Sequence, residues 1–263
     1  MKLPNTTTRL SKTATTMLKR KDESMNNKTT SKLIRSTILG KAKFAVVAAA
    51  TALSLAVVDA DAQNVNIQNP NAIAGQVSWS SSANNWVFTA GNNSIIEFGA
   101  FNIYHGGSVQ FIQPGANSAV LNRIIGADPS TINGGLSSNG RLFFVNPAGI
   151  TFGANAVLNV GQIYAAAGSI SNSDFLGGNY RFTNLDGTVK NLGTINASSG
   201  VALMGQHVVN QGQIYAPGGF ITLAAADKVI LAPEGSGIII QIDRTTSSGT
   251  SQAGIENTGL LNA

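Results

Sequence analysis

Carboxylates and histidines are the side chains that could do acid–base or metal chemistry in this sequence, and they are few and scattered. Paired carboxylates on one strand face would indicate polysaccharide cleavage or calcium binding, but no spacing produces an obvious pair among Asp128, Asp174, Asp186 and Asp243. Neither His105 nor His207 has a second His or Cys at metal-ligand spacing. We therefore expect no catalytic site, no metal and no cofactor. A polysaccharide-active enzyme built on a β-helix remains the alternative.

Amide and turn chemistry is concentrated at Asn146-Pro147-Ala148-Gly149. Pro147 fixes φ at the first corner of a turn, and Gly149 can adopt positive φ. Such a turn either shapes a corner of the fold or presents itself to a partner. Both interpretations stay open from the sequence alone.

The elements around this turn belong to an internal repeat. Four segments fit N-x-G-x-[IL]-[YN]-A, and their first residues are Asn159, Asn191, Asn210 and Asn257. Each unit has a turn followed by a short strand whose alternate side chains point inward. In stacked coils the four asparagines are predicted to form a ladder, and the apolar residues four positions later to lie above one another: Ile163, Ile195, Ile214 and Leu261. Val201 and Leu203 likewise recur as Ile221 and Leu223.

The pattern predicts an all-β chain folded as a right-handed parallel β-helix. Short β-branched runs alternate with Gly, Asn and Ser, and no apolar helical spacing persists beyond two turns. Residues 63–86 are expected to form an amino-terminal cap, with Trp79 and Trp86 covering the first coil. A β-sandwich with similar hairpins is the alternative fold.

The first 62 residues resemble an extended signal peptide. Residues 1–43 carry eleven Lys or Arg and two acids, 44–58 are apolar, and Ala60-Asp61-Ala62 is a typical cleavage site. We expect cleavage after Ala62, with an uncleaved membrane anchor as the alternative and Met1, Met17 or Met25 as the start. Residues 63–244 are then the main β-helical domain, and 245–263 begin a further repeat of an unfinished solenoid.

The basicity of the chain belongs to this leader. From residue 63 onward there are six Lys or Arg and eight Asp or Glu, which leaves a net charge of −2. Six scattered cations cannot form the basic face that nucleic-acid binding requires, so we exclude nucleic acid as a partner. The sequence contains no cysteine, so an exported form would be held together without disulfides.

Three blocks resemble one known family. They are 122–136 (NRIIGADPSTINGGL), 139–153 (NGRLFFVNPAGITFG) and 174–182 (DFLGGNYRF). These blocks are similar to the haemagglutination-activity, or two-partner-secretion, domain at the amino terminus of filamentous haemagglutinin and related adhesins. The family pattern has Asn-Pro-Asn-Gly at the turn, so Ala148 departs from it, and the side-chain amide of the family's second Asn is lost here.

The resemblance implies an exported domain, and not an enzyme. It implies passage through the general secretory translocon and the periplasm, capture by the POTRA domains of an outer-membrane β-barrel transporter, and release to the medium or the surface of a Gram-negative cell. The exoprotein would be an adhesin or haemagglutinin with a host-cell or glycan receptor. The residues implied in partner recognition or folding are Asn146, Pro147 and Gly149, with Arg123, Asp128 and Pro129 in the preceding block.

Overall fold

The computed structural model describes residues 64–234, 237–243 and 254–263. The described residues from 64 onward belong to one compact unit. The expected boundary between residues 244 and 245 lies outside the described residues. The predicted leader and its cleavage site lie outside the described residues. Within the described part of the chain, no helix has the length and apolar character that a membrane span needs.

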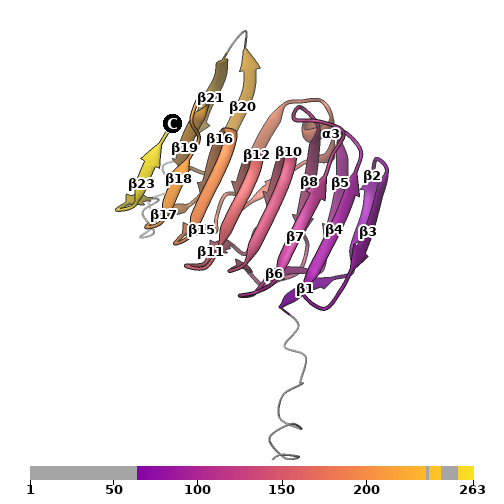
Figure 1. The fold of residues 1–263 in the computed structure, drawn as a ribbon. Helices are drawn as coiled ribbons and strands as arrows, with labels where there is room; N and C mark the ends of the chain where they lie inside the picture. The colour runs from indigo at the N-terminus through magenta and orange to yellow at the C-terminus, as the bar shows by residue number, and fades with distance from the viewer. Residues whose placement is uncertain (1–63, 235–236, 244–253) are drawn as a thin grey trace, which may run out of the picture. The chain divides into compact units, whose positions relative to one another are not determined.

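The described chain is built from strands that stack in successive coils. Figure 1 shows these coils side by side, from β3 at one end to β23 at the other. One seven-stranded sheet contains, in spatial order, β1 (Val65–Gln68), β6 (Ala100–Ile103), β9 (Ser130–Ile132), β11 (Ile150–Phe152), β15 (Thr188–Asn191), β17 (His207–Asn210) and β22 (Gly254–Asn257). Apart from β1, neighbouring strands in this sheet run parallel.

The second sheet has twelve strands and supplies the other sides of each coil. Its members are β2 (Asn71–Ala74), β3 (Val77–Ser81), β4 (Asn85–Ala90), β5 (Ser94–Phe98), β7 (Ser108–Ile112), β8 (Ala119–Ile124), β10 (Gly135–Val145), β12 (Val157–Ala166), β16 (Thr194–Gly205), β18 (Gln213–Tyr215), β19 (Phe220–Ala225) and β23 (Leu260–Asn262). The long strands β10, β12 and β16 pair in parallel, with irregularities in register that divide each strand into two segments. The parallel pairing confirms the fold class predicted from the repeats.

The amino-terminal cap consists of three strands that run against the direction of the coils. Strands β1, β2 and β3 pair antiparallel with β6, β5 and β4 respectively. Trp79 contacts Phe88 at 6.1 Å between ring centroids but keeps 42% of its surface exposed. Trp86 belongs to β4, which pairs in parallel with β7, so this tryptophan is part of the first coil and does not cover it from outside.

The repeat alignment is confirmed in three of its four units. Ile195 pairs with Ile214, which pairs with Leu261. On the next face, Val201 pairs with Ile221 and Leu203 with Leu223. The first unit was aligned incorrectly: the partner of Ile195 in the preceding coil is Leu158, whereas Ile163 pairs with Val201.

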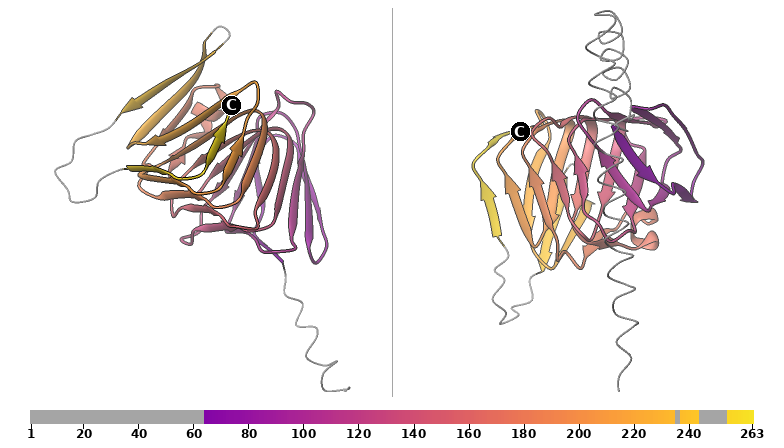
Figure 2. Two further views of the ribbon diagram at one scale, coloured as in Figure 1. Left: turned by 60° about the vertical axis from the view of Figure 1, so that its left-hand side comes forward. Right: turned by 90° about the horizontal axis from the view of Figure 1, so that it is seen from below.

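A small antiparallel sheet and a helix lie outside the coils. The sheet contains β13 (Ser169–Ile170), β14 (Tyr180–Thr183), β20 (Lys228–Glu234) and β21 (Gly237–Asp243), and α3 spans Asn172–Leu176. Figure 2 gives two further views of this layer against the coils. The sequence did not predict α3, because five residues are too few to show helical periodicity. Its start is capped by Ser171, whose Oγ accepts a hydrogen bond from the Asp174 amide at 3.0 Å.

Candidate secretion turn and the asparagine ladder

The Asn146–Gly149 turn joins β10 to β11 at a corner of the coil. The Gly149 amide donates to the Asn146 carbonyl at 3.0 Å, which closes a four-residue turn with Pro147 at its second position. Gly149 has φ of +117°, and a Cβ there would lie 3.1 Å from the carbonyl oxygen of Thr188 in the next coil. A side chain at this position would therefore strain the backbone and crowd the neighbouring coil.

Asn146 is fully buried, and its side chain holds the corner together. Its Nδ2 donates to the Asp128 carbonyl at 3.1 Å and to the Ser130 hydroxyl at 3.0 Å. Its Oδ1 accepts from the Ala148 amide at 2.9 Å. One side chain thus connects its own turn to the loop of the preceding coil, and burial leaves no atom of it for a partner to contact in the folded state.

The residues around Asn146 divide into a buried and an exposed set. Ser130 and Gly149 are buried, and the Ser130 amide donates to the Gly149 carbonyl at 3.0 Å. The exposed set comprises Asp128, Pro129, Pro147 and Ala148, together with Ile125, which is 62% exposed. We call these five residues the corner surface. The departure from the family pattern at Ala148 falls on this surface and removes no buried contact.

The backbone of Arg123 pairs with Val145 beside the turn, but its side chain binds groups outside the corner surface. Its guanidinium pairs with the Glu97 carboxylate at 3.0 Å and donates to the Ile170 carbonyl at 2.8 Å and to Asn172 Oδ1 at 2.7 Å. Arg123 therefore connects β5 to the outer layer. The structure brings together five of the six predicted residues: Asn146, Pro147, Gly149, Asp128 and Pro129. The guanidinium of the sixth, Arg123, is engaged with the outer layer.

The predicted asparagine ladder forms from three residues. Asn191 Nδ2 donates to Asn210 Oδ1 at 2.8 Å, and Asn210 Nδ2 donates to Asn257 Oδ1 at 2.7 Å. Asn159 was wrongly assigned to this ladder. It lies on β12, where its Oδ1 accepts from Asn196 Nδ2 at 3.0 Å on the exposed face, because the first repeat unit is out of phase.

The aspartates considered for acid–base or metal chemistry do not form a site. Asp174 accepts from the Ser171 hydroxyl at 2.7 Å within the cap of α3, while Asp128 and Asp186 are exposed. Across the described ranges, no group of three or more His, Cys, Asp or Glu could hold a metal ion.

The sequence did not predict two sets of polar residues, one at the corner and one on the outer face of the coils. The first is Ser130, whose hydroxyl accepts a hydrogen bond from Asn146 Nδ2. No sequence motif singles out this serine, which lies at the start of a strand two residues after Asp128. Asn196 and Tyr215 lie beside Asn159 on a shared face of the coils. Correct alignment of the first repeat would have revealed this second group.

Comparisons with known proteins give one consistent result. The family model of the TPS secretion domain matches residues 56–263. The crystal structure of the HMW1 secretion domain from Haemophilus influenzae superimposes with a TM-score of 0.64 at 30% identity, covering 68% of this chain and 50% of that chain. A heme/hemopexin-binding protein of H. influenzae strain Rd is 28% identical over 179 residues, or 64% of this chain.

The relatives are much longer than the region they share with this chain. The match spans 19% of that heme/hemopexin-binding protein, and a second heme/hemopexin-binding protein of H. influenzae is 31% identical over 88 residues, 10% of its length. The shared region is the secretion domain of exported proteins, and such domains are substrates of outer-membrane transporters. With a family model covering most of its length and a solved relative of the same architecture, the chain belongs to the TPS secretion domain family, the substrates of two-partner secretion.

Proposed function

We propose that this chain directs the export of an exoprotein by binding the periplasmic POTRA domains of a dedicated outer-membrane β-barrel transporter. The family match over residues 56–263 is the observation that carries the proposal. The basic, then apolar leader ending at Ala62 supports delivery to the periplasm through the general secretory translocon. The relatives are secretion domains rather than enzymes, which favours export over polysaccharide cleavage.

We assign different roles to the buried and exposed parts of the corner. Asn146 and Gly149 act by building the fold, because their atoms contact neighbouring coils and not solvent. Pro147, Asp128 and Pro129 belong to the exposed corner surface, where a partner can reach them in the folded domain. Folding outside the cell then adds coil upon coil and opposes backward movement through the barrel.

Secretion with and without the transporter tests the main proposal. The full chain is co-expressed with a POTRA-bearing barrel protein of the two-partner type, and the part from Gln63 onward is measured in the medium. We expect its appearance to depend on the barrel protein. Release in the absence of that protein would contradict the proposal.

Two variants separate the folding role from the contact role. Asn146→Ala should reduce both secretion and thermal stability, because it removes three hydrogen bonds at a buried corner. Ala148→Arg places a large cation on the corner surface and should reduce secretion while leaving thermal stability unchanged. Asn71→Ala, on an exposed position of β2, is the control and should be secreted normally. Normal secretion of Ala148→Arg would contradict a contact at this surface.

We further propose that the exoprotein is an adhesin or haemagglutinin acting at the cell surface or in the medium. The resemblance to filamentous haemagglutinin and the likeness to the HMW1 secretion domain support this role. The named ligands of the heme/hemopexin-binding relatives make heme a competing ligand for the exoprotein. Agglutination of red cells by the secreted product, compared with its binding of hemin, distinguishes the two.

A further inference from the structure

A column of polar side chains runs across the coils on the outer face of the twelve-stranded sheet. Strand register aligns one residue from each of five consecutive strands: Gln110, Ser137, Asn159, Asn196 and Tyr215. Leu158 and Val160, on either side of Asn159 in sequence, belong to the inner core, so the column faces outward. Neighbouring strands lie about 4.8 Å apart, so the five positions span roughly 19 Å.

The surface beside this column is hollowed, for a reason visible in the register. Each of these long strands has unpaired residues between its two segments. On β12 this is the single residue Gly161, whereas β10 has two, Asn139-Gly140, and β16 has two, Ser198-Ser199. A corner that is one residue shorter than both neighbours is recessed between them. The groove there has a volume of about 500 Å³, and an adjoining hollow of about 440 Å³ extends it toward Gln110.

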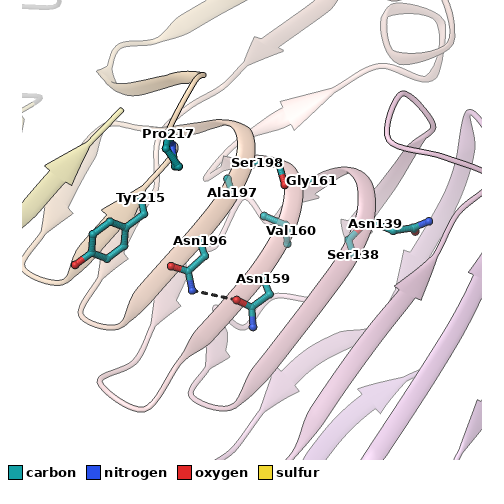
Figure 3. Close-up of a pocket in the computed structure, with 10 residues that line it drawn as sticks. All are labelled: Ser138, Asn139, Asn159, Val160, Gly161, Asn196, Ala197, Ser198, Tyr215 and Pro217. Atoms are coloured by element: carbon teal, nitrogen blue, oxygen red, sulfur yellow. Dashed lines mark hydrogen bonds between the residues drawn. The ribbon is translucent and has the colours of Figure 1, made fainter.

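The groove offers unused hydrogen-bonding groups and no charge. Figure 3 shows Tyr215, Asn196 and Asn159 one after another, with the bond from Asn196 to Asn159 between them. An asparagine amide has two donor hydrogens and a carbonyl with two lone pairs, so each of the two retains both kinds of group after that bond. The lining contains no Asp, Glu, Lys, Arg or His.

Tyr215 supplies an aromatic surface at one end of the groove. Its hydroxyl donates to Gln213 Oε1 at 2.9 Å, which fixes the ring, and the side chain is half-buried. The aromatic ring thus presents an apolar surface, and the neighbouring asparagine amides can both donate and accept hydrogen bonds. Sugars have the matching combination, with apolar C–H faces and hydroxyls that donate and accept.

We propose that this groove binds a neutral linear oligosaccharide along the axis of the coils. An extended peptide would instead add to a free sheet edge through its main chain, but β12 is already paired with β10 and β16 on its two sides. Only side chains are available here, and their lack of charge disfavours sulfated or acidic glycans. The proposal is independent of transporter recognition, because the groove and the corner surface involve different residues.

Binding of defined sugars to the secreted full chain tests the proposal. Cellohexaose, laminarihexaose, maltohexaose and chitohexaose are titrated up to about 10 mM by saturation-transfer NMR and calorimetry, a range suited to the millimolar affinity of an open groove. We expect at least one to bind. Tyr215→Ala and the double variant Asn159→Ala/Asn196→Ala should each weaken binding about tenfold, since each removes direct contacts. Tyr215→Phe keeps the ring and should retain most of the affinity.

Controls make each outcome decisive. Asn71→Ala should bind like the unmodified protein, and thermal unfolding verifies that every variant is folded. The proposal is overturned if none of the four sugars binds, or if binding survives in both groove variants. It is also overturned if heparin, or a neutral Gly/Ser/Asn decapeptide, binds more tightly than the sugars. Release of a sugar-binding chain in the absence of the barrel protein would count only against transporter recognition.

Discussion

The two faces of the same strands are buried in different ways. On β10, Leu142 and Phe144 point into the coils, while Phe143 and Val145 point outward. The inner core is closed by the coils themselves, each apolar residue stacking on its counterpart. The outer core is closed by α3 and the small antiparallel sheet, which contribute Phe175, Tyr180 and Phe182 to an aromatic cluster around Phe143.

This difference shows that one repeat can support two kinds of packing. The inner core depends on repetition, so its contacts follow from strand register alone. The outer core depends on segments inserted between coils, so its contacts join residues without any shared pattern. We therefore expect the inner core to unfold with the whole domain and the outer layer to open separately.

The largest expected effect is the loss of an inner aromatic ring. Phe144→Ala removes a fully buried ring that meets Phe101 at 5.0 Å between centroids, and it should lower the free energy of unfolding by about 4 kcal/mol. Phe143→Ala should cost about 3 kcal/mol and release hydrogen-exchange protection selectively in residues 169–183. Denaturant unfolding with hydrogen exchange measures both. Equal loss of protection throughout the coils in Phe143→Ala would refute the separation of the two layers.

A smaller effect is expected in the asparagine ladder. Asn210→Ala removes two hydrogen bonds and leaves Asn191 Nδ2 without its ladder partner, at a cost of about 2 kcal/mol. Asn159→Ala, which removes one bond on an exposed face, should change the free energy of unfolding by less than about 0.5 kcal/mol. Chemical denaturation compares them. Similar losses of unfolding free energy in the two variants would show that burial does not make the Asn210 bonds more stabilising than the Asn159 bond.

The outer core should respond to alkaline pH. Burial, and then the proximity of Tyr180, raise the pKa of Tyr164 above its ordinary value. Because the folded pKa is raised, the stabilising contribution is present below about pH 10 and is lost as pH rises, by about 1.4 kcal/mol per pH unit. Tyr164→Phe should reduce this loss, as measured by urea unfolding between pH 8 and about 11. An unchanged pH dependence would show that another group causes it.

The smallest effect is expected on the corner surface. Ala148→Asn restores the family pattern at an exposed position, so the free energy of unfolding should change by less than about 0.5 kcal/mol. Thermal unfolding measures this change. A gain of more than 1 kcal/mol would indicate that the added amide forms a structural bond.

Much of the coil could be predicted from the sequence, and the errors have a physical origin. The stacking of Ile195, Ile214 and Leu261 follows from a motif whose spacing is short and regular. The first unit failed because the segment from Asn159 to Ala165 spans the irregularity within β12, whereas the segment from Asn191 joins one sheet to the other. The residue of the preceding coil that pairs with Asn191 is Phe152, which does not fit the motif. Resemblance between local motifs does not determine register when loop lengths vary.

The candidate site was predicted in part for the same reason. The Asn146 turn was identified from its residues, because Pro and Gly restrict backbone geometry locally. That the amide of Asn146 reaches Asp128 and Ser130 depends on the stacking of one coil on the next, which no local pattern encodes.

The sequence by itself determined the all-β class, the repeating inner core and the turn at residues 146–149, since these depend on alternation and on backbone preferences of individual residues. Only the tertiary structure decided which residues of that turn are buried, where Arg123 binds, and how α3 and the small sheet cover the outer face. The groove beside Asn159 was also decided only by the tertiary structure. Each of these features arises from contacts between coils or insertions distant in sequence, whose alignment is set by packing and not by local composition.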